Sequence, residues 1–271
     1  MTTLSGKKGL IIGIANEHSL AHGCARHFRA AGADLAITWL NAKAEPYVRP
    51  LAEALGSTIL MPCDVAVPGQ LEAVYARIAK DWGRLDFVQH SIAYARKEDL
   101  SGRITDCSAE GFALAMDISV HSFLRMAKLS ETLMPAGGCL LAMSYYGAEK
   151  AIAHYNIMGP VKAALEAAVR YMAVELGRTG IRVNALSPGP VKTRAASGID
   201  HFDELLERAV REAPEHRLVT LDDIGAYAAF LVSDAARAIT GNVAADRKPA
   251  QQNAAIPQGE GSAKPKGRQR G

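Results

Sequence analysis

Tyr155 and Lys162 are the two residues of this chain whose types and spacing could do chemistry. They lie in SYYGAEKAIAHYNIMGPVK, residues 144–162, which also holds Tyr145 and Tyr146, although the chain has only eight tyrosines. Seven residues make about two helical turns, so the phenol and the amine would project to nearly the same side. An ammonium group beside a phenol favours the phenolate and makes the phenol a stronger proton or hydrogen-bond donor.

Pro160 restricts how this segment can fold. Proline is tolerated in the first turn of a helix and not further in, so the helix must begin close to Pro160 and Tyr155 must lie at its start. A tyrosine and a lysine seven residues apart are common by chance. This pair is more specific, because it follows an apolar segment that ends at Tyr145. Tyr146 would point to the opposite face of that strand and is interpreted as packing.

A second candidate segment is GIANEHSLAHG, residues 13–23, between an apolar run and a helical pattern. A dinucleotide pyrophosphate needs a tight turn, close approach of the backbone and a helix N-terminus. Gly13 could supply the turn, Ser19 a hydroxyl and the N-cap, and Ala21 and Gly23 close packing. The segment is not G-x-G-x-x-G, so an ordinary strand–helix loop remains the alternative.

Asp64, after the third apolar run, could accept a hydrogen bond from an adenine amino group, and the alternative is a helix-capping aspartate. The second run ends TWLNAKAE, without the aspartate that often binds an adenosine ribose. Lys43 could meet a 2′-phosphate, but a single lysine there is more often solvated. These residues therefore determine the choice between NADH and NADPH only weakly, and we expect NADH.

Composition excludes several classes of protein. No apolar stretch reaches the ~18–20 residues of a membrane span, and no signal peptide is recognisable. Cys24, Cys63, Cys107 and Cys139 lack metal or disulfide spacing and are interpreted as free thiols of a cytoplasmic protein. His18 and His22 lack a third ligand, so no metal site is predicted. Residues 246–271 hold six basic and two acidic residues of a chain with net charge +3, so the body is near neutral and a nucleic-acid surface is not indicated.

Short apolar runs alternate with helical patterns along the body of the chain. A stripe of apolar residues at 3–4 spacing runs from Val161 to Leu176. Strands that are apolar throughout and separated by helices predict a parallel sheet covered on both faces, hence one doubly wound, Rossmann-like α/β domain. We expect strands at 9–15, 34–40, 57–65, 85–95, 139–147 and 181–189, and helices at 19–32, 68–83, 110–134 and 159–180. We assign residues 1–245 to this domain and 246–271 to a disordered basic tail.

Together these residues resemble the short-chain dehydrogenase/reductase superfamily, and within it the divergent branch of bacterial enoyl-[acyl-carrier-protein] reductases. The resemblance runs from about Lys8 to Gly241. It rests on the two segments above and on CDV, HSIAYA and RVNALSPGPVKTRAASGI.

Two departures from the common superfamily pattern concern the chemistry. Ala142 stands thirteen residues before Tyr155, where ketone and alcohol enzymes have a serine, and Asp117 stands near the position of their helix asparagine. The enoyl branch has a second tyrosine ten positions before the first, as Tyr145 is here.

The resemblance implies NAD(P)H-dependent reduction of a trans-2-enoyl thioester of acyl carrier protein in fatty-acid synthesis. Hydride would pass to C3 while Tyr155 stabilises the enolate, Lys162 anchors the nicotinamide ribose, and Tyr145 shapes the pocket or assists Tyr155. The implied cofactor-binding residues are Gly13, Ser19, Leu20, Asp64, Val65, Ser91, Ile92, Lys162 and Val191, and the substrate-binding residues are Ala93, Ala95, Tyr145 and Tyr155.

The resemblance also implies a homotetramer, a lid over the acyl chain at about 192–217, and an acidic carrier protein docked near Lys192, Arg194 or Arg208. An ordinary surface helix pair is the alternative for the lid.

After AITGNV the family continues into a last strand with an aspartate, paired glycines and an aromatic residue, whereas this chain runs AADRKPAQQNAAIPQG. Loss of that strand would weaken the tetramer, loosen the pocket or leave a folded protein of low activity. Two alternatives therefore stay open: a reductase of another carbonyl or enoyl substrate, and a non-catalytic nucleotide-binding protein built on the same scaffold.

Overall fold

The computed structural model describes residues 3–100, 103–152, 154–191, 193, 202–213 and 215–246. Their seven strands are β1 (Lys8–Ile12), β2 (Asp34–Trp39), β3 (Ile59–Pro62), β4 (Phe87–His90), β5 (Gly138–Met143), β6 (Ile181–Pro188) and β7 (Val243–Asp246). They form one parallel sheet in the order β3-β2-β1-β4-β5-β6-β7. This confirms the predicted doubly wound α/β class.

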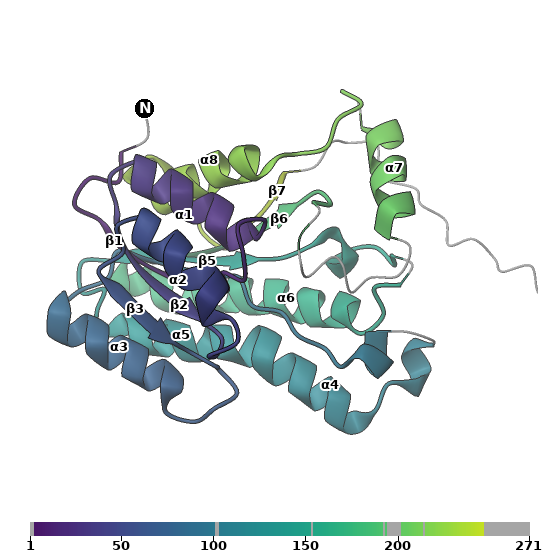
Figure 1. Ribbon diagram of the computed structural model, residues 1–271, viewed down its shortest axis with the longest axis horizontal. Coiled ribbons are helices and arrows are strands. Elements are labelled where there is room, and N and C mark those ends of the chain that lie inside the picture. Colours follow the sequence, from purple (N-terminus) through teal and green to yellow (C-terminus); the bar gives the residue numbers. More distant parts are fainter. Residues whose placement is uncertain are drawn as a thin grey trace, which may run out of the picture.

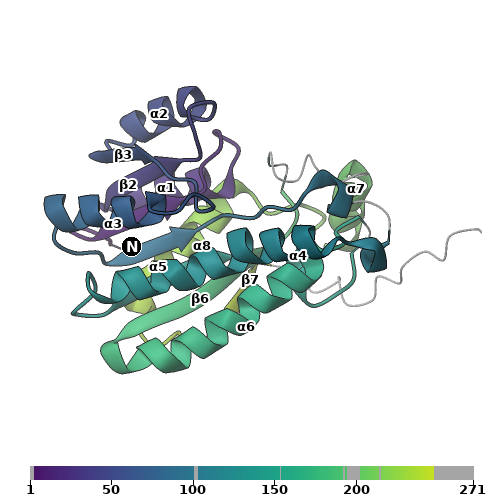
Figure 2. The ribbon, with the colours of Figure 1, turned by 90° about the horizontal axis from the view of Figure 1, so that it is seen from below.

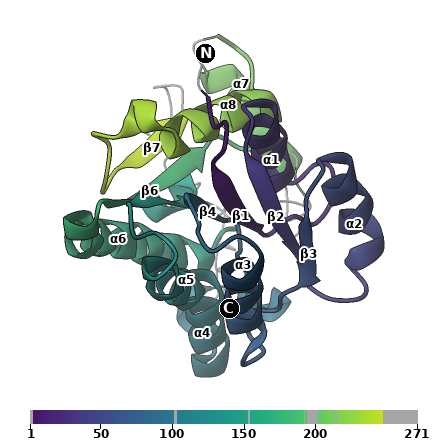
Figure 3. The same cartoon turned by 90° about the vertical axis from the view of Figure 1, so that its left-hand side faces the viewer.

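Helices cover both faces of the sheet. They are α1 (Leu20–Ala30), α2 (Glu45–Ala54), α3 (Gln70–Asp81), α4 (Ala109–Met116), α5 (Ser122–Glu131), α6 (Met158–Leu176), α7 (Phe202–Glu212) and α8 (Leu221–Val232). One apolar cluster joins the sheet to α1, α2 and α8, and a second joins it to α3, α5 and α6. Figure 3 shows helices on both sides of the sheet. Helix α7 stands apart from both layers, beyond one end of the sheet (Figures 1 and 2).

The predicted strands are longer than the observed ones at their carboxyl ends. The fourth stops at His90 and the fifth at Met143, whereas the sequence pattern continued to Ala95 and Gly147. The residues beyond these ends form loops whose apolar side chains, including Ile92 and Tyr145, pack against the core. Apolar composition therefore continues after the strand hydrogen bonding has ended.

The long helix predicted over 110–134 is interrupted. A π-helical segment, Asp117–His121, lies between α4 and α5. Such segments widen a helix locally and often lie near functional sites. Helices α2 and α8 were not predicted, and in α2 the prolines Pro46 and Pro50 obscure the pattern.

The expected loss of the last strand is wrong. Residues 243–246 pair with β6 through their backbone, and Ala244 buries its methyl group without any need for glycines or an aromatic residue. Asp246 is the last residue of β7. The rest of the predicted tail, 247–271, lies outside the described residues.

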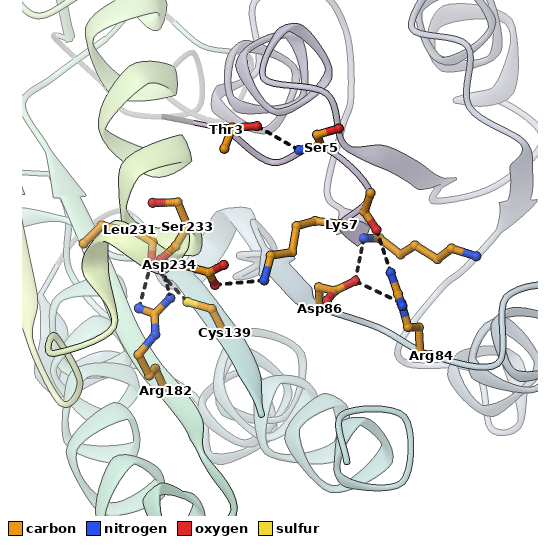
Figure 4. A network of polar contacts seen from close by, with 12 residues as sticks. Thr3, Ser5, Lys7, Arg84, Asp86, Cys139, Arg182, Leu231, Ser233 and Asp234 are labelled. Atoms are coloured by element: carbon orange, nitrogen blue, oxygen red, sulfur yellow. Dashed lines mark hydrogen bonds and ion pairs between the residues drawn. The ribbon is translucent and has the colours of Figure 1, made fainter. Parts of the chain in front are cut away.

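Polar contacts hold the amino ends of the strands together (Figure 4). Arg182, at the start of β6, donates hydrogen bonds to the carbonyls of Leu231, Ser233 and Ile239. Lys7 Nζ contacts Asp234 Oδ1 at 2.8 Å. A parallel sheet binds its ligands at the carboxyl ends of its strands. The contacts of Arg182 and Lys7 lie at the opposite end of the sheet.

Candidate active site

Gly13 and Ser91 meet where the strand order reverses, between β1 and β4. Gly13 has φ +116°, and a Cβ there would lie 2.2 Å from the Ser91 carbonyl oxygen. Only glycine fits a turn with this φ and this close an approach. The structure thus brings two of the predicted cofactor residues together at the switch point, where doubly wound sheets bind ligands.

The loop after Gly13 leads into the N-terminus of α1, whose first turn has no acidic residue. Ser19 is the N-cap, as predicted, but its hydroxyl does not cap the helix and instead donates to the Asn16 carbonyl at 2.5 Å. Leu20 is the first helical residue. The first backbone N–H groups of a helix have no intrahelical partner, so this terminus suits an anion.

Asp64 and Val65 follow β3, at the edge of the sheet. Asp64 Oδ1 accepts a hydrogen bond from the Ala66 amide at 2.9 Å, so part of its capacity stabilises its own turn. Val65 is buried and its carbonyl accepts from Arg125. The aspartate therefore stabilises its own turn and does not cap α3 (Gln70–Asp81), whose N-cap residue is Gly69.

The segment after β5 carries the candidate chemistry. Tyr145 lies two residues beyond the strand and Tyr146 begins a short 3₁₀ helix, so neither is a strand residue as predicted. Tyr146 is buried, in agreement with a packing role. The Tyr145 and Tyr155 rings meet edge to face with centroids 4.9 Å apart.

Gly147 forms the other side of the Tyr155 site. A Cβ on Gly147 would lie 2.3 Å and 2.5 Å from two Tyr155 ring carbons, so the ring lies directly against the Gly147 backbone. The residues flanking Tyr155 both adopt left-handed backbone conformations, His154 with φ 61° and Asn156 with φ 36°. Positive φ is uncommon for residues other than glycine and collects at functional sites.

Tyr155 is 8% exposed, and burial raises the pKa of its phenol well above its usual range, with Tyr145 and Glu166 acting in the same direction. The spacing of Tyr155 and Lys162 predicts a stronger hydrogen-bond donor and a shift of the phenol toward the phenolate. Burial opposes that shift and dominates, because a low-dielectric surrounding disfavours the charged form. At neutral pH Tyr155 is therefore a protonated hydrogen-bond donor.

Lys162 lies one turn into α6, and Pro160 lies in the first turn of that helix, as predicted. Tyr155 precedes the helix by three residues. Lys162 Nζ is buried and donates to the Met143 carbonyl oxygen at 2.6 Å. Burial lowers the pKa of this amine to about 8, and the Glu166 carboxylate partly offsets the effect. Lys162 and Tyr155 thus both contact the segment Met143–Tyr145.

His90 is a buried titratable group near Lys162. Its Nε2 lies 2.8 Å from Ser122 Oγ, and that hydroxyl donates to the Ile118 carbonyl, so Nε2 carries the proton. Burial, followed by the charge of Lys162, lowers the pKa of His90 to about 3. His90 is therefore neutral at physiological pH.

The predicted substrate residues lie in the loop after β4. Ala93 is exposed, whereas Ala95 and Ile92 are half-buried against the core. The Tyr94 amide donates to Ser119 Oγ at 3.0 Å, which ties this loop to the π-helical segment. Asp117, near the position of the helix asparagine of ketone and alcohol enzymes, is exposed and pairs with His121 at 2.9 Å.

The lid prediction is described only in part. Residues 202–212 form α7 and Val191 packs against the core, but 192, 194–201 and 214 lie outside the described residues. Lys192 and Arg194 are among these, and nothing describes the side chain of Arg208 within α7. The predicted docking residues therefore have no structural account.

Unpartnered polar atoms collect at the carboxyl ends of the strands. Thr38 Oγ1, Trp39 Nε1, Gln89 Oε1, His90 Nδ1 and Ser187 Oγ are buried without a hydrogen-bond partner. Such groups are rare in proteins and are costly unless water or a ligand satisfies them. With the Gly13 turn and the α1 terminus, they make this edge of the sheet fit a polar dinucleotide.

Other chemistry is not seen in the described part of the chain. It contains no group of three or more metal-ligating side chains, and none of its helices has the length and hydropathy of a membrane span. Burial raises the pKa values of Cys24 and Cys63 to about 12, so these thiols are unreactive.

Sequence reasoning missed four residues of this site: Ser144, Gly147, Glu166 and His90. Glu166 left a signal, because a carboxylate four residues after Lys162 interrupts the buried side of an apolar helix. Gly147 left none, since its role comes from the approach of a ring that lies eight residues away in the chain.

Comparison with known proteins agrees with this architecture. A family model described as enoyl-(acyl carrier protein) reductase matches residues 13–245. An NADH-type enoyl-[acyl-carrier-protein] reductase of Rhizobium meliloti is 46% identical over 240 residues, covering 89% of this chain and 88% of its own length.

Solved structures agree as well. The enoyl reductase of Anaplasma phagocytophilum in complex with NAD has a TM-score of 0.87 at 46% identity, covering 90% of this chain and 93% of its own. That of Aquifex aeolicus has a TM-score of 0.89 at 43% identity, covering 93% and 99%.

The fold and the switch-point site define a dinucleotide-binding α/β reductase of the short-chain type. Within that class, the chain belongs to the enoyl-(acyl carrier protein) reductase family.

Proposed function

We propose that this chain catalyses the NADH-dependent reduction of the trans-2 double bond of enoyl-acyl-carrier-protein thioesters in fatty-acid synthesis. The observation that carries the proposal is the Tyr145–Tyr155–Lys162 cluster at the carboxyl end of β5, in a chain of this family. When bound, the nicotinamide supplies the hydride that is transferred to C3 of the acyl chain.

Tyr155 donates a hydrogen bond to the thioester oxygen as negative charge develops on it. A placed donor contributes most where charge appears in the transition state, and removing one typically costs about 2.7–4 kcal/mol. The raised pKa of the buried phenol keeps this donor protonated. Tyr145 fixes the ring of Tyr155 by its edge-to-face contact and shapes the substrate pocket.

Ala142 supports an enoyl substrate over a ketone. It is fully buried in β5, at the position where ketone and alcohol enzymes of the superfamily have a serine. A methyl group cannot donate a hydrogen bond to a carbonyl, so the described site polarises its substrate through tyrosine.

Lys162 binds the ribose hydroxyls of the nicotinamide while it stays anchored to the Met143 carbonyl. The remaining cofactor contacts are assigned to Gly13, Ser19, Leu20, Asp64, Val65, Ser91, Ile92 and Val191. Lys43 lies exposed on the loop after β2, where a single solvated lysine does not make a binding site for a 2′-phosphate. We therefore assign NADH as the preferred cofactor.

The acyl chain is assigned to a pocket formed by Ala93, Ala95, Tyr145 and Tyr155, with residues 192–217 as the lid. The acyl carrier protein, which is acidic by the family resemblance, docks near Lys192, Arg194 or Arg208. Both assignments rest on the sequence resemblance.

A cytoplasmic homotetramer is the proposed form of the protein. Tyr171 and Val174 on α6 are each 80% exposed, and Leu124 on α5 is 39% exposed. Large apolar side chains on the surface of neighbouring helices favour a subunit contact there.

The test mixes purified protein, NADH or NADPH and a crotonyl or longer enoyl thioester, and follows the absorbance of the reduced nicotinamide. Consumption with enoyl but not with 3-oxoacyl thioesters supports the proposal, and the reverse preference contradicts it. Tyr155→Phe should lower kcat while sparing NADH affinity, whereas Lys162→Ala should impair both. If Lys162→Ala leaves NADH affinity unchanged, the anchoring role is wrong.

A further inference from the structure

Glu166 is a buried carboxylate that the proposed function does not use. It lies four residues after Lys162 on α6, so the two side chains share one face of the helix. Glu166 is 6% exposed and Lys162 is 5% exposed. Burying a charge is expensive unless the charge is both paired and hydrogen-bonded, so this arrangement needs a physical reason.

Two consecutive residues at the carboxyl end of β5, Met143 and Ser144, fix both charges. The Met143 carbonyl accepts from Lys162 Nζ at 2.6 Å, and Ser144 Oγ donates to Glu166 Oε1 at 2.5 Å. Tyr145, the next residue, contacts the ring of Tyr155. The same three-residue segment therefore sets the positions of the amine, the carboxylate and the phenol relative to one another.

The other ionisable groups around Lys162 do not replace Glu166. His90 on β4 is neutral, and the raised pKa of Tyr155 keeps its phenol protonated at neutral pH. Glu149, after β5, is exposed and does not contribute to the charge balance of Lys162. Among the described groups, Glu166 is the anion that acts on this amine.

A pocket of about 500 Å³ lies on the side of α6 that carries Glu166. Glu149, Glu166, Arg170 and Asn242 are among its lining residues. The carboxylate thus has contact with a solvent-filled space that includes neither Tyr155 nor Gly13.

We propose that Glu166 is a positioning residue that keeps Lys162 protonated and aimed at the cofactor. Without the carboxylate, burial acts on the amine unopposed. The proposal rests on the role of Lys162 under the proposed function.

The experiment measures NADH affinity of the full chain by nicotinamide fluorescence across pH 6 to about 10, with wild type and Glu166→Gln. Glutamine keeps the oxygen that accepts from Ser144 and removes the charge. In the wild type, affinity should fall as pH rises through about 8, the pKa of Lys162. In Glu166→Gln this fall should move to lower pH by about one unit or more, as expected for loss of a nearby opposite charge. A merely structural role would lower stability or affinity at all pH values and leave the position of the fall unchanged, which would overturn the proposal.

Two further variants test whether the shift is specific to the charge of Glu166. Glu149→Gln removes a carboxylate from the same pocket and should leave the wild-type profile in place. Glu166→Asp retracts the charge by one methylene and should give a smaller shift in the same direction. If Glu166→Gln does not fold, Glu166→Asp serves as the test. An unshifted pH profile of NADH affinity in Glu166→Asp would then refute the proposal.

Lys162→Arg separates failure of this inference from failure of the proposed function. Arginine stays charged across the range, so the alkaline fall should disappear. If the fall persists in Lys162→Arg, the role of Lys162 itself is wrong. If it disappears there but Glu166→Gln does not shift it, the inference about Glu166 alone is wrong.

Discussion

Gly147→Ala should reduce turnover by displacing the ring of Tyr155. The new Cβ would lie 2.3 Å from a ring carbon, whereas carbon atoms in contact are about 3.5–4.0 Å apart. The ring must therefore move by about 1–2 Å to restore an ordinary contact, because the opposing atoms belong to the Tyr155 side chain. A misplacement of about 1 Å at a reacting group typically costs about 10²-fold in rate.

The assay follows kcat for enoyl-thioester reduction together with the free energy of unfolding. Gly177→Ala is the matched control, because a Cβ at Gly177 meets nothing within 4 Å and should leave kcat unchanged. The double variant Gly147→Ala/Tyr155→Phe should be no slower than Tyr155→Phe alone, since both changes act on the same phenol. Wild-type kcat in a folded Gly147→Ala variant would refute the reasoning. Additive losses in the double variant would show that Gly147 acts through another group.

Gly9→Ala should destabilise the fold by about 1–3 kcal/mol through overpacking, because its Cβ would lie 2.1 Å from a Phe87 ring carbon. Chemical denaturation measures this, and an unchanged midpoint would contradict it. Burial holds the pKa of His90 at about 3 in the folded state, below its ordinary value of 6.5, so the unfolded chain binds this proton first as pH falls. Stability should drop by about 1.4 kcal/mol per pH unit below about pH 6, and this slope should be shallower in His90→Gln. Arg182→Lys should lose stability, at about 1.5–3 kcal/mol for each charge-assisted hydrogen bond lost, because a lysine amine does not reproduce the planar fork with which the guanidinium reaches three carbonyls. Thermal unfolding checks this, with Arg178→Lys, an exposed residue, as the control.

The class of fold could be predicted because apolar runs and helical patterns alternate along the chain. Strand ends could not, since Ile92 and Tyr145 lie in loops yet still pack against the core. Strand β7 could not be predicted because its side chains do not have the family pattern. Backbone pairing with β6 requires no particular side chains, so the absence of the family glycines did not prevent it.

The candidate site could be predicted where residue type decides the chemistry, as with Tyr155 and Lys162. It could not be predicted where geometry decides. The raised pKa of Tyr155 could not be predicted, because spacing suggests an ammonium neighbour but says nothing of how deeply the phenol is buried. The hydrogen bond from Ser144 to Glu166 joins residues 22 positions apart, and only the packing of α6 against the end of β5 creates it.

The hydrogen bonds around Arg182 have a practical consequence for protein engineering. Strand β6 has eight residues, so its two ends lie about 25 Å apart. Substitutions that raise stability can be sought at the amino ends of the strands, around Arg182, Lys7 and Asp234. These positions lie far from the phenols of Tyr145 and Tyr155. Heat resistance and turnover should then be adjustable as separate properties of the same sheet.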